Sequence, residues 1–160
     1  MNIYLDMVGC RLNQSELETY ARQFRENGHT LVGKANEADL VVMNTCAVTA
    51  EAASDSRQKI RQAARSGAGQ IAVTGCWSTL YPEAAKELPN VHHVIPNARK
   101  DGLVKDVLNL QAQDFDLEPM AREPLPGLRQ RTRAFIKVQD GCDNRCTFCL
   151  TTLARGASRS

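Results

Sequence analysis

The stretch Asp39-Leu40-Val41-Val42-Met43-Asn44-Thr45-Cys46 decides the fold, because it is a short apolar run that ends in polar residues. A continuous, valine-rich run of this length predicts a strand that is buried on both faces. Such strands belong mainly to parallel sheets with helices on both sides. We therefore predict a central strand at 39–44 that leads directly into Cys46.

Strand-like and helix-like patterns alternate around this run over the first hundred or so residues. The further predicted strands lie at 3–8, 70–74 and 91–95, with a small one at 30–33. Helices are predicted at 49–65, 82–88 and 100–109, and a fourth starts at a capping-box-like pair, Asn13 and Glu16, and stops at Gly28. This alternation predicts an α/β fold: an open, mainly parallel sheet with helices on both faces.

The composition is that of an ordinary folded protein. A chain of 160 residues suits one domain with an appendage, and a net charge of +2 is too small to define a partner. Neither a basic leader with an apolar stretch nor a run of membrane-spanning length occurs, so we expect the cytoplasm. In that compartment the six cysteines are expected to be metal ligands or reactive thiols rather than disulfides.

A change of composition divides the chain. The alternating pattern covers residues 1–113, which we predict to be one domain. Residues 114–133 contain Pro119, Pro124, Pro126 and Gly127 and are predicted to be a linker. A new strand is expected at 134–139, so residues 134–160 would begin a second unit, which carries a surplus of basic side chains.

The stretch Gly141-Cys142-Asp143-Asn144-Arg145-Cys146-Thr147-Phe148-Cys149 spaces three thiols as C-x3-C-x2-C. Three thiolates can hold three corners of a [4Fe-4S] cube and leave its fourth iron open for chemistry. A zinc knuckle or a partial disulfide is the alternative, but zinc needs a fourth cysteine or histidine nearby. The three histidines, His29, His92 and His93, suit surface or packing positions better than metal binding.

The other three cysteines share a position relative to the predicted strands. Cys10, Cys46 and Cys76 each follow the carboxyl end of a strand and precede a helix. Ligands collect at that edge of open α/β sheets, and helix N-termini favour thiolates. The alternative is that these cysteines only fill the core, since free cysteine is among the most buried residue types. Their shared placement favours a role as ligands of one group.

The cysteine spacing, with the aromatic Phe148 before the last thiol, resembles the radical S-adenosylmethionine (SAM) superfamily. Further stretches narrow the resemblance to the methylthiotransferases, which replace a C–H bond with C–SCH3. These stretches occur in the family's order along nearly the whole chain, at Val8-Gly9-Cys10-Arg11-Leu12-Asn13-Gln14-Ser15-Glu16, Asn44-Thr45-Cys46, Thr74-Gly75-Cys76, Gln139-Asp140-Gly141-Cys142 and Ala154-Arg155-Gly156-Ala157-Ser158-Arg159-Ser160.

The resemblance implies two [4Fe-4S] clusters, each with an open iron. An auxiliary cluster maps onto Cys10, Cys46 and Cys76, and the radical SAM cluster, which binds S-adenosylmethionine, maps onto Cys142, Cys146 and Cys149. One SAM would supply the radical and another the methyl group, with the auxiliary cluster as the staging post for sulfur. The implied partners are a tRNA anticodon stem-loop and an electron donor such as flavodoxin. No catalytic side chain is assigned.

Two branches of the family compete for this chain. The stretch around Cys10 and the lead-in Ile136-Lys137-Val138-Gln139-Asp140-Gly141-Cys142 look most like the branch acting on N6-threonylcarbamoyladenosine beside the tRNA anticodon. Sister branches modify isopentenyladenosine in tRNA or an aspartate of a ribosomal protein. The latter usually has a proline and a lysine soon after the first cysteine, where this chain has Arg11-Leu12. We therefore favour tRNA over ribosomal protein.

The chain departs from the family in two respects. Thr152 and Leu153 stand where the family usually has a proline and an aromatic residue, which predicts a looser loop after the cysteines or a divergent gene. The chain also stops at the first strand and cysteine loop of an incomplete radical SAM barrel. One strand and one loop cannot enclose SAM, so we expect an N-terminal fragment that is inactive alone.

Two further functions remain as alternatives. The first is an iron–sulfur or electron-transfer module that holds a cluster without turnover. The second is an RNA-binding module whose basic tail contacts phosphates. That tail consists of Arg129, Arg131, Arg133, Lys137, Arg145, Arg155 and Arg159. Against the RNA-binding interpretation, several of these side chains are expected to be solvated or paired with carboxylates.

Overall fold

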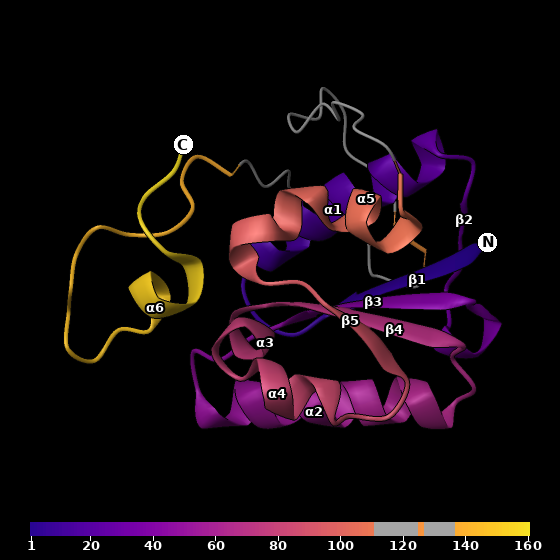
Figure 1. The fold of residues 1–160 in the computed structure, drawn as a ribbon, viewed down its shortest axis with the longest axis horizontal. Coiled ribbons are helices and arrows are strands. Elements are labelled where there is room, and N and C mark those ends of the chain that lie inside the picture. Colours follow the sequence, from indigo (N-terminus) through magenta and orange to yellow (C-terminus); the bar gives the residue numbers. More distant parts are fainter. Residues whose placement is uncertain (111–124, 127–136) are drawn as a thin grey trace.

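A computed structural model describes residues 1–110, 125–126 and 137–160 (Figure 1). Its centre is a five-stranded sheet in the order β2-β1-β3-β4-β5, with every neighbouring pair parallel. The strands are β1 (Asn2–Met7), β2 (Thr30–Leu31), β3 (Leu40–Thr45), β4 (Gln70–Gly75) and β5 (Val91–Val94). The predicted α/β fold class is confirmed.

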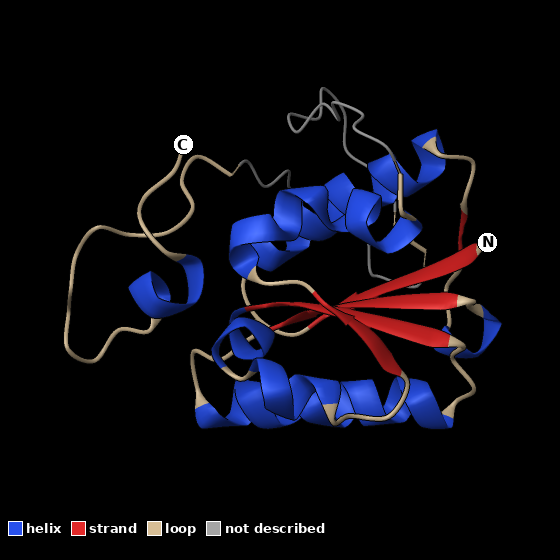
Figure 2. Ribbon diagram, in the orientation of Figure 1, coloured by secondary structure: helices blue, strands red, loops and turns tan. Residues whose placement is uncertain are grey.

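Helices cover both faces of the sheet (Figure 2). One face carries α1 (Arg11–Glu26) and α5 (Leu103–Leu108), and the other carries α2 (Ala50–Arg65), α3 (Cys76–Leu80) and α4 (Pro82–Lys86). Two 3₁₀ turns, η1 (Ala35–Glu37) and η2 (Asn97–Gly102), join these elements. A last helix, α6 (Thr151–Arg155), lies in the C-terminal segment beyond the carboxyl ends of the strands.

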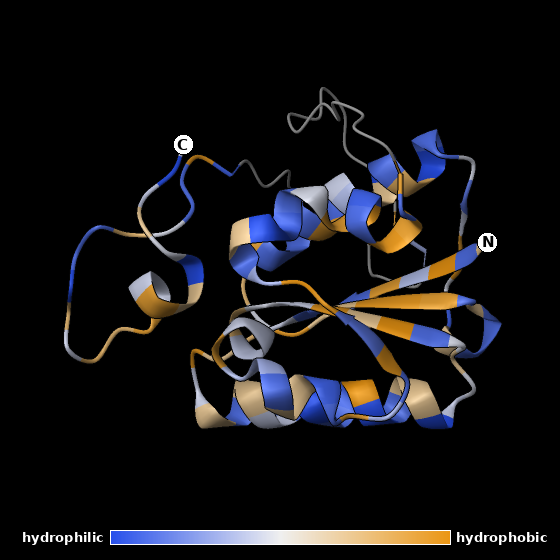
Figure 3. Cartoon of the chain, in the orientation of Figure 1, coloured by the Kyte–Doolittle hydropathy of each residue, from blue (hydrophilic) through white to orange (hydrophobic). Residues whose placement is uncertain are grey.

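Strand β3 is central because both of its faces are apolar. All six of its residues are buried, and successive side chains point to opposite faces of the sheet. Val41 and Met43 pack in the layer of α2, α3 and α4, whereas Leu40 and Val42 pack in the layer of α1 and α5. Figure 3 shows the hydrophobic residues gathered along the strands. Two cores of this kind hold the sheet edge in a fixed place.

The structure differs from the sequence predictions at three places. Helix α1 begins at Arg11 with Cys10 as its N-cap, so Asn13 and Glu16 lie inside the helix and form no capping box. The backbone after β4 turns at once into α3, a helix that the sequence did not predict. The predicted helix at 100–109 is a 3₁₀ turn followed by the short α5, and a left-handed Asn109 ends it.

The C-terminal segment is folded back on itself. Asp140 and Arg159 form an isolated antiparallel bridge, so the cysteine loop between them is closed at its base. Residues 137–139 are not in a strand, and the rest of the strand predicted at 134–139 lies outside the described residues. The same holds for most of the linker predicted at 114–133. Within the described part of the chain, no helix is long and apolar enough to cross a membrane.

Candidate functional site

The order of the strands places a ligand edge beside β1 and β3. In the sheet, β2 lies on one side of β1 and β3 lies on the other. The direction in which strands are added therefore reverses between β1 and β3. In doubly wound sheets the crevice outside the carboxyl ends of the strands at such a reversal is the usual binding site. Cys10 follows β1 and Cys46 follows β3, so both lie at this crevice.

Cys46 and Cys76 stand next to each other in strand register. The last residue pair of β3 and β4 is Thr45 with Gly75, and each cysteine is the next residue. The Thr45 hydroxyl donates to Thr74 O (2.6 Å) and accepts from Ser78 N (3.1 Å), which fixes α3 against the end of β3. Both thiols are buried, whereas Cys10 at the start of α1 is exposed.

Helix α2 and the turn after β1 hold Cys46 in place. The buried Ser56 hydroxyl accepts from Cys46 N (3.1 Å) and lies 3.3 Å from Cys46 O. Gly9 has a φ of +122°, and a Cβ added there would lie 2.7 Å from Cys46 Cβ and 2.9 Å from Cys46 Sγ. Only glycine therefore lets the turn that carries Cys10 approach the sulfur of Cys46.

Replacing Gly9 with alanine is expected to push the turn away from Cys46 and to reduce the iron bound by the N-terminal cysteines by at least about tenfold. Gly28→Ala is the matched control, since Gly28 also has a positive φ (+76°) but its added Cβ would meet nothing within 4 Å. Iron and sulfide content per chain after anaerobic reconstitution measures both variants. Equal iron content in the two variants would contradict this role of Gly9.

Cys76 lies in a buried polar environment. Burial raises the pKa of its thiol, while the charge of Arg155 and hydrogen bonding from Arg155 and Asn97 oppose that rise. Asn97 is 1% exposed, and its Nδ2 lies 3.8 Å from Cys76 Sγ. The pKa of the Cys76 thiol is raised overall, and the nearby donors and the charge of Arg155 lessen the cost of forming the thiolate, which is the form that binds metal.

Cys142, Cys146 and Cys149 occupy a loop with its own hydrogen bonds. Cys142 N donates to Gly156 O (3.1 Å), and Cys149 N donates to Cys146 O (3.1 Å). The second of these bonds brings the last two cysteines within one turn. Cys146 is exposed, and the other two are partly exposed.

Two threonines after the third cysteine stabilise this loop. The Thr151 hydroxyl lies 3.3 Å from Cys149 Sγ, and this hydrogen bond lowers the pKa of the Cys149 thiol. The Thr152 hydroxyl lies 3.0 Å from Cys142 O and 2.7 Å from Asn144 O. Thr152, at the family's usual proline position, therefore hydrogen-bonds to the cysteine loop, and the looser loop stays a prediction.

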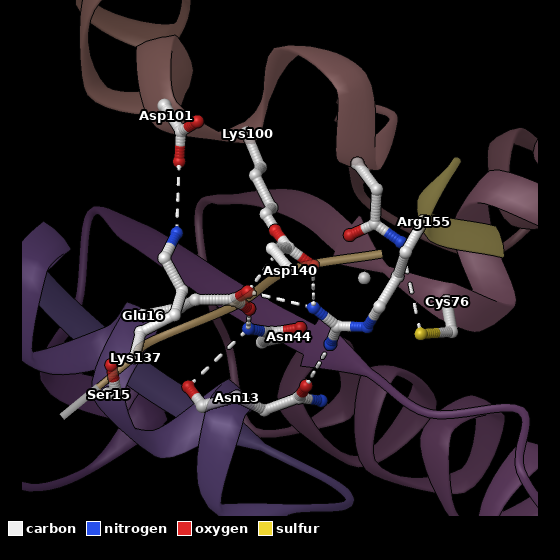
Figure 4. A network of polar contacts seen from close by, with 12 residues as sticks. Asn13, Ser15, Glu16, Asn44, Cys76, Lys100, Asp101, Lys137, Asp140 and Arg155 are labelled. Atoms are coloured by element: carbon white, nitrogen blue, oxygen red, sulfur yellow. Dashed lines mark hydrogen bonds and ion pairs between the residues drawn. The ribbon is translucent and has the colours of Figure 1, made fainter. Parts of the chain in front are cut away.

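Four buried charged side chains connect the C-terminal segment to the sheet edge (Figure 4). Glu16 on α1 lies 2.5 Å from Lys100 Nζ and 3.1 Å from Arg155 Nη1. Asp140, beside the cysteine loop, pairs with Lys100 and lies 2.8 Å from Arg155 Nη1. Asn44 Nδ2 also donates to Glu16 (2.8 Å), so β3 joins the network.

Interactions within the network shift the pKa values of Asp140 and Arg155. Burial by itself would raise the pKa of Asp140, but hydrogen bonds and charge from Lys100 and Arg155 outweigh it and hold the pKa at about 2. Burial by itself would lower the pKa of Arg155, and the carboxylates of Glu16 and Asp140 raise it instead. Asp140 and Arg155 therefore stay ionised at neutral pH and bound to each other.

Sequence reasoning had placed these residues elsewhere or missed them. Glu16 was predicted as a capping residue and Arg155 as part of a basic tail, whereas both are buried and paired. Lys100 and Asn97 were not singled out, and no local pattern marks them. Asp140 was the signal available in the sequence, because it is an acid directly before Gly141-Cys142. A carboxylate that becomes buried on folding needs a cationic partner.

The basic tail is only partly available for phosphate contacts. Arg155 points inward, Arg159 lies 3.4 Å from Asp140, and Lys137 lies 3.7 Å from Asp101. Arg145 is exposed, while Arg129, Arg131 and Arg133 lie outside the described residues. The structure thus removes Arg155 from the predicted RNA-contacting set.

Cys10, Cys46 and Cys76 follow the ends of three neighbouring strands. Across residues 1–110, 125–126 and 137–160, no group of three or more His, Cys, Asp or Glu is disposed to hold a metal ion. A [4Fe-4S] cube puts each thiolate on a different iron, so its ligands need not meet at one point. Gly9 packs closely against Cys46 Sγ, and Asn97 Nδ2 lies 3.8 Å from Cys76 Sγ.

A family match covers the N-terminal part of the chain. The family described as Uncharacterized protein family UPF0004 matches residues 2–96, which include Cys10, Cys46 and Cys76. This match spans every strand of the sheet and ends just before Asn97. The matched region is thus the sheet with its cysteine-bearing edge.

Curated relatives match along nearly the whole chain. The threonylcarbamoyladenosine tRNA methylthiotransferase MtaB of Thermotoga maritima is 34% identical over 96% of this chain and 36% of its own length. That of Aquifex aeolicus is 33% identical over 100% of this chain and 42% of its own length. The ribosomal protein uS12 methylthiotransferase RimO of Myxococcus xanthus is 33% identical over 99% of this chain and 36% of its own length. The chain thus spans well under half the length of these relatives, and it belongs to the methylthiotransferase family.

Proposed function

We propose that the chain is the cluster-binding part of a radical SAM methylthiotransferase that modifies tRNA. One observation carries the proposal: three cysteines far apart in sequence follow the carboxyl ends of β1, β3 and β4, which are neighbours in the sheet. The cysteine loop that follows is fixed against that same edge by Glu16, Lys100, Asp140 and Arg155. We therefore infer that both sets of three thiols serve one site at this edge of the sheet.

The two cysteine sets have different roles. Cys10, Cys46 and Cys76 hold an auxiliary [4Fe-4S] cluster, and Cys142, Cys146 and Cys149 hold a second one that binds SAM. When bound, these groups supply an electron for cleaving SAM and a site where sulfur is kept before transfer. The protein binds and orients them: Ser56 and Gly9 fix Cys46, and Thr151 and Thr152 fix the second loop.

Changing Cys46 to serine is expected to abolish cluster binding at the N-terminal set. In a chain that already carries Cys142→Ser, Cys146→Ser and Cys149→Ser, anaerobic reconstitution should give about four irons per chain, falling to near zero with Cys46→Ser. Iron and sulfide analysis with Mössbauer spectroscopy measures this. A protein that binds zinc and no iron under these conditions would sink the proposal.

We propose tRNA rather than a ribosomal protein as the substrate. The support is that relatives named as threonylcarbamoyladenosine tRNA methylthiotransferases match at 32% to 34% identity. Relatives named for ribosomal protein uS12 match at 31% to 33%.

Deleting the gene that encodes this chain should remove methylthio-threonylcarbamoyladenosine from the host's tRNA. Mass spectrometry of tRNA nucleosides and of uS12 peptides from the same cells separates the candidates. A gene copy that carries Cys46→Ser should not restore the modification, whereas the unaltered gene should. Loss of the uS12 modification with intact tRNA would assign the alternative substrate.

A further inference from the structure

Two buried asparagines link the N-terminal cysteines to helix α6. Each contacts a cysteine sulfur with its side-chain amide, and each also contacts a residue of α6 (Thr151–Arg155). Helix α6 begins two residues after Cys149, so it is the element that directly follows the second cysteine set. Asn13 and Asn97 therefore lie between the two sets.

Asn97 connects Cys76 with the backbone of α6. Its Nδ2 donates to Ala154 O (2.6 Å) and lies 3.8 Å from Cys76 Sγ, so one amide group serves both contacts. Its own backbone N donates to the Thr79 hydroxyl (2.9 Å), which in turn donates to Gly75 O (2.7 Å). The amide is thus placed by the end of β4, the strand that carries Cys76.

Asn13 makes the corresponding connection at Cys10. Its Oδ1 accepts from Arg155 Nη2 (2.8 Å) and lies 3.5 Å from Cys10 Sγ. Its Nδ2 donates to Val8 O (3.0 Å), just before the Gly9 turn. A shift of Arg155 would therefore move Asn13 and the turn that positions Cys10.

Hydrogen bonds to coordinating sulfur change the properties of a cluster. A donor on the sulfur stabilises the reduced, more negative state and raises the reduction potential. Asn97 is such a donor, and it is buried at 1% exposure, so water screens its effect little. Ala154 O on α6 orients the same amide, which makes the donor dependent on the position of α6.

We propose that Asn97 and Asn13 are positioning residues that couple the two cysteine sets. Asn97 donates to Cys76 Sγ and to Ala154 O of α6, and Asn13 binds both Arg155 of α6 and Val8 O in the turn that carries Cys10. The effect of these contacts on a cluster rests on the proposed function. Any movement of the second loop through α6 then reaches Cys10 and Cys76 by these contacts. The environment of the auxiliary cluster would thereby depend on the state of the loop that binds SAM.

The first test measures the reduction potential of the N-terminal cluster alone. In the chain with Cys142, Cys146 and Cys149 changed to serine, Asn97→Leu keeps the size of the side chain but removes the donor. We expect the ratio of reduced to oxidised cluster at a fixed potential to fall about tenfold, a shift of about 59 mV for a one-electron couple. Asn97→Asp, which also removes the donor, should shift the potential in the same direction.

Asn27→Leu is the matched control. It makes the same change of side chain at an asparagine whose Nδ2 donates to Gln23 O (2.8 Å), at the opposite end of α1 from Cys10. Its potential should stay within about twofold of the parent ratio. A parent-like potential in both Asn97 variants, or an equal shift in Asn27→Leu, would overturn the assignment of Asn97 to the sulfur.

The second test needs no cluster. In the metal-free chain, Asn97→Leu should speed hydrogen exchange of the α6 amides Ala154 N and Gly156 N at least about tenfold relative to Asn27→Leu. Unchanged exchange would show that Asn97 does not hold α6. If the parent chain binds no iron, the proposed function fails, whereas this exchange measurement still decides the link between Asn97 and α6.

Discussion

Replacing Glu16 with glutamine is expected to destabilise the chain by about 3–5 kcal/mol, because it leaves two buried cations with a single buried carboxylate. Glu16 binds both Lys100 and Arg155, and Asp140 would have to balance both alone. The side chains of Glu16, Lys100 and Asp140 are 1% to 3% exposed, so water cannot replace the lost carboxylate. A loss of this size is a large part of the stability of a typical domain.

Urea unfolding measures the effect, with Glu26→Gln as the matched control. Glu26 lies on the same helix and pairs with Arg22 at 4.0 Å, but its side chain is 50% exposed. The control should therefore change the free energy of unfolding by less than about 0.5 kcal/mol. In a double-mutant cycle, Lys100→Met should cost less in the Glu16→Gln chain than in the parent. Equal stabilities of Glu16→Gln and Glu26→Gln would contradict a buried network.

Replacing Gly75 with alanine is expected to cost more than about 4 kcal/mol or to prevent folding. Its Cβ would overlap Thr45 O and Asn44 Oδ1 and would lie 2.6 Å from Thr45 N. These atoms belong to β3, the neighbouring strand, so relief requires the carboxyl ends of β3 and β4 to separate. That separation would also move Cys46 and Cys76 apart, since each follows one of these strands.

Gly67→Ala is the control that measures the cost of backbone strain without a steric clash. Gly67 has the same φ as Gly75, +96°, but nothing lies within 4 Å of an added Cβ. Its cost should be about 1–2 kcal/mol, which is the strain of a side chain in this conformation. Circular dichroism and urea unfolding of both variants give the comparison. A Gly75→Ala chain as stable as Gly67→Ala would contradict the close approach of β3 and β4.

The fold was largely predictable because its signal is local. The apolar run at 39–44 and the alternation around it require only neighbouring residues, and β3 and β4 lie within a residue of their predicted positions. Helix α3 was missed because it starts directly at Cys76 and has only five residues, too few for a periodic pattern. Its N-cap, Gly75, adopts a backbone conformation that the sequence alone does not specify.

The candidate site was predictable only in part. Strand ends place Cys10, Cys46 and Cys76 on one edge, because parallel strands share a direction. The contact of that edge with α6 depends on pairs such as Glu16 with Arg155, which are 139 residues apart. Such pairs leave no local pattern, so the link between the two cysteine sets emerged only from the fold.

Locating iron in the chain itself tests the central claim most directly. Crystals of the anaerobically reconstituted chain, measured at the iron absorption edge, should give two separate groups of anomalous scatterers. We expect one group bonded to Cys10, Cys46 and Cys76 and the other to Cys142, Cys146 and Cys149, each with about four irons. Iron at the second set alone, or a single zinc ion at either set, would contradict the account.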